Sequence, residues 1–141
     1  MRITGRVVVL SALLIGLTLS SAFAADSKNV EGSPQAKAYR ALLKAIAAGD
    51  YEGMKKCMTK ESAAGIEKQT KEMKLDPKKG MEMMQAMTPS DLKLTSLKVE
   101  GKKATLEATG MVDKEVNKGT IALEQEDGQW KVANQSWTNA K

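Results

Sequence analysis

The apolar residues of this chain change their spacing halfway along the sequence, and that change constrains the fold more than any other feature. Between residues 33 and 88, apolar residues recur every three or four positions, the period of an amphipathic helix. From residue 92 onward they alternate with polar residues, the period of a strand with one buried face. Helices followed by consecutive strands predict an α+β fold, with N-terminal helices packed on one face of a four-stranded antiparallel sheet.

The first 24 residues differ from the rest. Arg2 and Arg6 precede an apolar run over residues 7–19, and Ala22 and Ala24 occupy the −3 and −1 positions of an A-x-A site. These features are typical of a cleaved signal peptide over residues 1–24. The apolar run is shorter than the roughly 20 residues needed to span a bilayer, and the next residue is Ala rather than the Cys of a lipoprotein. We therefore expect a periplasmic or secreted, soluble protein with no stable membrane anchor.

Capping residues divide the first half of the remaining chain. Residues 25–32 are polar and aperiodic, which predicts a flexible leader before a single domain over 33–141. Gly49 is placed to end the first helix as a C′ glycine, and the pair 88–89 (Thr-Pro) ends the last helix. Four residues with N-cap chemistry each begin an expected helix: Ser33, Asp50, Thr59 and Asp76.

The second half reads as four strands joined by turns. The apolar phase slips between Leu94 and Leu97, which predicts a β-bulge near residues 95–96. Turns are expected at residues 100–102, at residues 113–118 and at Asp127-Gly128, which is the strongest hairpin signal in the chain.

Composition excludes several functions. The chain has no His and one Cys, which rules out His-based catalysis, His-ligated metals and an intrachain disulfide. We expect Cys57 to be buried beside Met54 and Met58, the alternative being a covalent dimer. Removal of residues 1–24 lowers the net charge only from +5 to +3, and Arg40 is then the single arginine. That charge and the few aromatic residues do not predict nucleic-acid binding.

The two ends of the expected domain resemble the nuclear-transport-factor-2-like (cystatin-like cone) superfamily. Residues 38–52 contain an amphipathic helix, a Gly-Asp joint and the start of a second helix, and residues 126–132 (EDGQWKV) are similar to the last hairpin of such domains. The likeness is strongest to small secreted or lipid-anchored members of undefined function. It implies a strongly curved sheet wrapped around a long helix to form a cone.

The resemblance and the residues together favour a non-catalytic binding or protein-interaction module of the cell envelope. Its partner would be an apolar ligand or an envelope protein, and a homodimer is an alternative. The candidate lining residues of an apolar pocket are Tyr39, Leu43, Met84, Leu106 and Trp130. Each of them is also explained by closed core packing.

Two other functions stay open. A small-molecule enzyme on the same scaffold would have to use carboxylates or Tyr alone, and we assign no catalytic residue and no cofactor. A weak Cu(I) site is the other, because thioethers bind Cu(I). It would use the methionines of residues 81–87: Met81, Met83, Met84 and Met87.

The signal-peptide interpretation predicts a mature chain that begins at Ala25. Native mass spectrometry of protein purified from its own envelope should give the mass of residues 25–141. Recovery of the full-length mass would contradict the interpretation.

Overall fold

The computed structural model describes residues 23–25 and 29–141. Within these residues the chain forms four helices and five strands. In chain order they are β1 (Phe23–Ala25), α1 (Pro34–Ala47), α2 (Tyr51–Lys56), α3 (Lys60–Glu72), α4 (Pro77–Met87), β2 (Ser90–Glu100), β3 (Lys103–Val112), β4 (Glu115–Glu126) and β5 (Gln129–Asn139).

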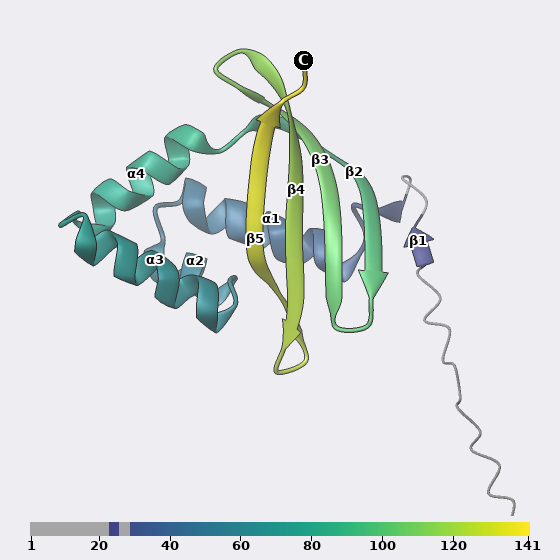
Figure 1. Ribbon diagram of the computed structural model, residues 1–141, viewed down its shortest axis with the longest axis horizontal. Coiled ribbons are helices and arrows are strands. Elements are labelled where there is room, and N and C mark those ends of the chain that lie inside the picture. The colour runs from purple at the N-terminus through teal and green to yellow at the C-terminus, as the bar shows by residue number, and fades with distance from the viewer. Residues whose placement is uncertain (1–22, 26–28) are drawn as a thin grey trace, which may run out of the picture.

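The sheet is an antiparallel meander in which each long strand pairs with the next one in sequence, from β2 to β5. It is curved and does not close (Figure 1). Helix α1 crosses the strands on one face, whereas α3 and α4 form an arm that extends beyond the β5 edge (Figure 1). The predicted α+β class, with helices packed on a curved four-stranded antiparallel sheet, is confirmed.

The expected N-caps are confirmed at all four helices. In each case the side chain of the cap accepts a hydrogen bond from a backbone N–H in the first turn, and these caps are Ser33, Asp50, Thr59 and Asp76. Gly49 has a φ of 68° just after α1, as a C′ glycine requires.

Helix α2 ends at Lys56 because the chain after it joins the sheet. The Val132 N–H donates to the Cys57 carbonyl at 2.9 Å, and the Thr59 N–H donates to the Val132 carbonyl at 3.0 Å. These two bonds also cover part of the β5 edge, which would otherwise be open for pairing with another strand.

The expected irregularities of the sheet are largely confirmed. Leu94 faces Ala108 and Ser96 faces Glu107, so Thr95 is the extra residue of a bulge. The turn between β3 and β4 is tighter than the expected 113–118 segment, because β4 already begins at Glu115. Its two residues, Asp113 and Lys114, have φ values of 51° and 66°, as a type I′ hairpin turn requires.

The core lies between α1 and the concave face of the sheet. Its fully buried side chains include Tyr39 and Leu42 of α1, Leu106 of β3, and Ile121 and Leu123 of β4. Leu106 faces Ile121 across the β3–β4 pair, and Leu123 faces Val132 across the β4–β5 pair. The alternating apolar residues of the strands therefore share one inward face, as their period predicts.

The packed part of the chain begins earlier than the sequence indicates. Val30, within the expected flexible leader, is fully buried in the core, and Glu31 forms an ion pair with Arg40 at 2.6 Å. The burial of Val30 could not be predicted from the sequence, because most of the residues in 25–32 are polar. The domain thus includes residues 29–32 as well as 33–141.

Strand β1 is not predicted by the sequence. Its backbone pairs antiparallel with residues 97–99 at the outer edge of β2. The strand spans the expected cleavage junction, whereas residues 1–22 of the expected signal peptide lie outside the described residues. No helix in the described part of the chain is long and apolar enough to cross a membrane.

Candidate functional site

An apolar cavity of about 680 Å³ lies beside the C-terminal half of α1. The other walls are α2, the arm formed by α3 and α4, and the ends of β3, β4 and β5 near the β3–β4 turn. Its apolar lining residues are Leu42, Leu43, Ile46, Met54, Met58, Ile66, Met84, Ala86, Met87, Pro89, Val112 and Trp137. Gln69, Met87 and Asp113 are exposed, so the cavity opens to solvent between the arm and this turn.

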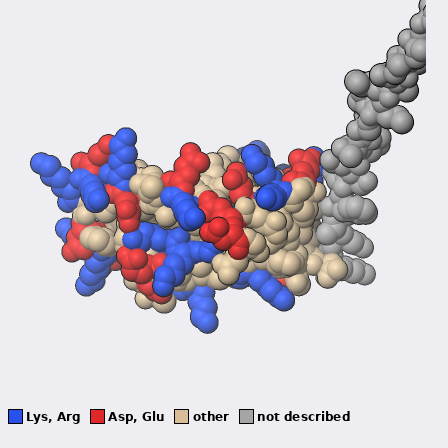
Figure 2. All heavy atoms as spheres, turned by 90° about the horizontal axis from the view of Figure 1, so that it is seen from below, with Lys and Arg blue, Asp and Glu red and all other residues tan. Residues whose placement is uncertain are grey.

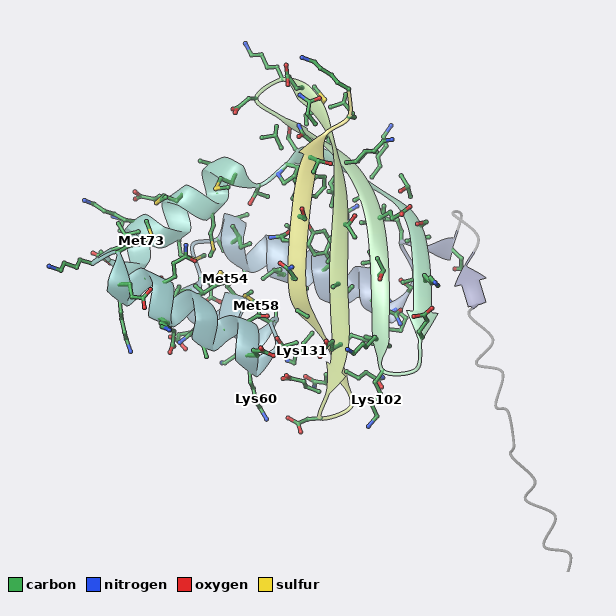
Figure 3. The ribbon with its side chains drawn as sticks, in the orientation of Figure 1. Met54, Met58, Lys60, Met73, Lys102 and Lys131 are labelled. Atoms are coloured by element: carbon green, nitrogen blue, oxygen red, sulfur yellow. The ribbon has the colours of Figure 1, made fainter. Side chains whose placement is uncertain are left out.

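Four methionines, from α2, from the segment after it and from α4, line this space. Met54 of α2 is fully buried, and Met58 lies just after α2. Figure 3 shows both between the helical arm and β5, whereas Met73 lies at the outer end of α3. Met84 and Met87 complete the lining from α4. Flexible thioether side chains can adapt to apolar surfaces of different shapes.

One polar side chain of the cavity is held by the core. The Tyr39 hydroxyl donates a hydrogen bond to Gln135 Oε1 at 2.9 Å. Tyr39 is fully buried, whereas Gln135 is exposed and lines the cavity. The bond therefore links the closed core to the open space beside it.

Burial raises the pKa of Tyr39 to about 12, because the ionised phenolate would lose its hydration. The indole of Trp137 and the positive charge of Arg40 lower the pKa by smaller amounts. The Trp137 indole thus lies near the phenol oxygen, although its buried Nε1–H makes no hydrogen bond with good geometry to any described residue. The Tyr39 hydroxyl therefore stays protonated at neutral pH.

A strand glycine makes room for the Trp137 ring on the concave face. Gly119 is the cross-strand partner of Trp137, and a Cβ atom at Gly119 would lie 2.7 Å from the indole carbon atoms. Gly110, on the neighbouring strand, is required by a different contact, because a Cβ atom there would lie 2.7 Å from Pro89 Cβ. The ring covers the glycine backbone that side chains would otherwise cover.

Two of the five predicted pocket residues, Leu43 and Met84, line the cavity, and the other three do not. Tyr39 and Leu106 are fully buried in the core, and Tyr39 reaches the cavity only through its bond to Gln135. Trp130 is partly buried against the core near the β4–β5 turn and does not line the cavity.

The four methionines of the Cu(I) hypothesis have different surroundings. Met81 is 3% exposed in the core, Met83 is 49% exposed outside the cavity, and Met84 lines the cavity. Met87 is 71% exposed at the cavity mouth. Among the described residues, no group of three or more His, Cys, Asp or Glu side chains could hold a metal ion.

Cys57 is half-buried and forms no disulfide within the described chain. Burial raises the pKa of its thiol, which is the expected effect of removing a thiolate from water. The neighbouring charge of Lys131 acts in the opposite direction with a smaller effect. The thiol is therefore not activated by its surroundings.

Several lysine residues form ion pairs with acidic neighbours. Lys55 pairs with Glu52 at 2.8 Å and with Glu67 at 2.6 Å, and Lys103 pairs with Glu124 at 3.7 Å. Figure 2 shows basic and acidic side chains intermixed on the face that it presents. This pattern gives little support to an electrostatic surface for anionic polymers or lipids.

Sequence reasoning missed most of the cavity. Three lining residues that the sequence analysis does not name as candidates are Ile66, Gln135 and Trp137. The usable signal was the glycine in each of two neighbouring strands, Gly110 and Gly119, because a strand glycine marks close approach of another group.

No protein-family model matches this sequence, no curated protein is detectably similar to it, and no solved structure matches it.

A Gly119→Ala substitution should lower the free energy of unfolding by about 1–3 kcal/mol, because the added methyl group would overlap the Trp137 ring. Gly80→Ala is the matched control, since a Cβ atom there meets nothing within 4 Å in α4. It should raise stability by about 0.5–1 kcal/mol. Urea unfolding followed by circular dichroism measures both, and equal effects would contradict the account of the Trp137 ring.

The raised pKa of Tyr39 predicts a loss of stability at alkaline pH. The neutral phenol is favoured in the folded state, so this contribution is complete below pH 10 and is lost as the pH rises to about 12. The free energy of unfolding should fall by up to about 2–3 kcal/mol over this interval. Tyr39→Phe should lack this part of the decline, whereas Tyr51→Phe should keep it. Identical profiles for the two variants would show that Tyr39 is not the group responsible.

Proposed function

We propose that this chain is an exported, non-catalytic binding protein that holds an apolar ligand in the cavity between α1, the helical arm and β5. The observation that carries the proposal is the cavity itself. Its volume of about 680 Å³ lies within the range of about 300–1,000 Å³ that is usual for small-molecule sites. Its walls are mostly aliphatic and thioether side chains with a few polar groups among them, which is the usual composition of such sites.

The chemistry of the lining supports binding over catalysis. Asp113 is the only ionisable side chain among the described lining residues, and it is exposed in the β3–β4 turn. The buried Tyr39 has a pKa of about 12 and would be a poor acid or base at neutral pH. The alternative of a small-molecule enzyme therefore has less support than a binding site.

The proposal also includes the superfamily to which the fold belongs and the export of the chain. Membership of the nuclear-transport-factor-2-like superfamily is supported by the order of helices before a curved meander and by the first helix on the concave face. Export is supported by the basic start, the apolar run and the A-x-A site of residues 1–24.

A protein partner or a second copy is the weaker alternative. The exposed large apolar residues of the described chain are Met73, Met83, Met87 and Val116. They come from the C-cap of α3, from α4 and from β4, and only Met87 borders the cavity. The cavity is therefore the better-defined apolar site.

The proposal predicts that filling the cavity abolishes ligand binding without unfolding the protein. Ile66→Trp enlarges a lining side chain on α3, a helix that contains no buried residue. We expect this variant to bind the neutral apolar dye N-phenyl-1-naphthylamine at least about tenfold more weakly than the unmodified protein, as measured by dye fluorescence.

Ala64→Trp is the matched control, because Ala64 lies on the same helix, is exposed and does not line the cavity. This control should bind the dye normally. Absence of saturable dye binding to the unmodified protein, or equal binding by the two tryptophan variants, would overturn the proposal.

A further inference from the structure

We propose that the ligand is an uncharged amphiphile whose carbonyl oxygen accepts a hydrogen bond from Gln135 Nε2, while its apolar chain lies among the methionines of the cavity. This inference rests on the proposed function and adds the chemical class of the ligand to it. It comes from three observations: the fixed orientation of one amide, the charge of the lining and the nature of the apolar walls.

The orientation of the Gln135 amide follows from its buried partner. Tyr39 is fully buried, and its hydroxyl proton is donated to Gln135 Oε1. A buried hydroxyl left without an acceptor costs about 1–3 kcal/mol, so this bond keeps the carbonyl of the amide turned toward Tyr39. The NH₂ group of the same amide makes no hydrogen bond within the described chain and is available to a molecule in the cavity.

Other polar groups of the lining are less suited to this role. The Asn117 side-chain NH₂ donates to the Glu115 carbonyl at 3.0 Å, and the Thr88 hydroxyl donates to the Met84 carbonyl at 2.7 Å. Gln69 is exposed on α3 at the cavity mouth. Gln135 is thus the donor that a buried neighbour holds in place.

The charge of the lining selects against acids. No lysine or arginine is among the described lining residues, and the single charged side chain is the carboxylate of Asp113. A carboxylate that entered the apolar space would lose hydration without gaining a cation. A carbonyl oxygen needs only one hydrogen-bond donor, which Gln135 supplies.

The apolar part of the ligand would contact several thioether side chains. Met54 and Met58 come from α2 and the segment after it, and Met84 and Met87 come from α4. Such walls do not demand one rigid shape, which favours a flexible alkyl chain over a single fused ring.

The test compares three probes of equal chain length: decanamide, decanoate and decylammonium, at a pH where the acid and the amine are charged. The Trp130→Phe protein leaves Trp137 as the single tryptophan, and its fluorescence reports occupancy of the cavity. Decanamide should bind at least about tenfold more tightly than decanoate or decylammonium. Equal or tighter binding of either charged probe would overturn the inference.

A pair of substitutions tests the role of the amide. In the same Trp130→Phe protein, Gln135→Met keeps a similar side-chain length but removes the donor, and it should weaken decanamide binding by about 3–10-fold, the effect of one hydrogen bond. Gln129→Met is the control at an exposed glutamine of the same strand that does not line the cavity, and it should leave the affinity unchanged. Equal affinities of the two variants for decanamide would contradict the role of Gln135.

The outcomes also separate this inference from the proposed function. If all three probes bind with similar affinity and each displaces the apolar dye from the unmodified protein, the cavity is a binding site and only the ligand class is wrong. If none of the three binds and the apolar dye does not bind either, both proposals fail. The comparison of probes on one protein does not depend on whether Gln135→Met folds.

Discussion

The packing of α1 across the concave face of the sheet is the constraint on which the rest of the structure depends. A helix is about 10 Å wide, whereas a ten-residue strand is about 33 Å long. A single helix that crosses the strands, as α1 does (Figure 1), therefore covers only part of their length. Tyr39, Leu42 and Ile46 close the core under the helix. The concave surface toward the β3–β4 turn needs other cover, and the arm formed by α3 and α4 supplies it incompletely.

Two contacts lie between the closed core and the cavity. Gly119 leaves space for the Trp137 ring, and the bond from Tyr39 to Gln135 joins the buried helix to the last strand. Both contacts are made by β5, which is also the strand that the segment after α2 joins through Val132. Strand β5 therefore contacts the core, the cavity and the segment that leads from α2 to α3.

Much of the fold was predictable from the sequence because its signals are local. The caps at Ser33, Asp50 and Thr59 and the bulge at Thr95 each depend on a few neighbouring residues, and each is confirmed. The cavity was not predictable in the same way, because its walls come from seven elements and the loop segments between them. A periodic pattern shows which residues are apolar. It does not show that Leu106 is buried in the core whereas Leu43 lines an open cavity. The same limit applies to Val30, whose burial depends on where the residues around it pack.

The central claim, that the space between α1, the arm and β5 receives an apolar ligand, is tested most directly by NMR of the methionine methyl groups. Met54, Met58, Met84 and Met87 line the cavity, whereas Met73 and Met83 are exposed on the same helical arm but outside it. Addition of decanamide should shift the methyl signals of the first four and leave those of Met73 and Met83 unchanged. Shifts confined to Met73 and Met83, or no saturable shift at any methionine, would contradict the account.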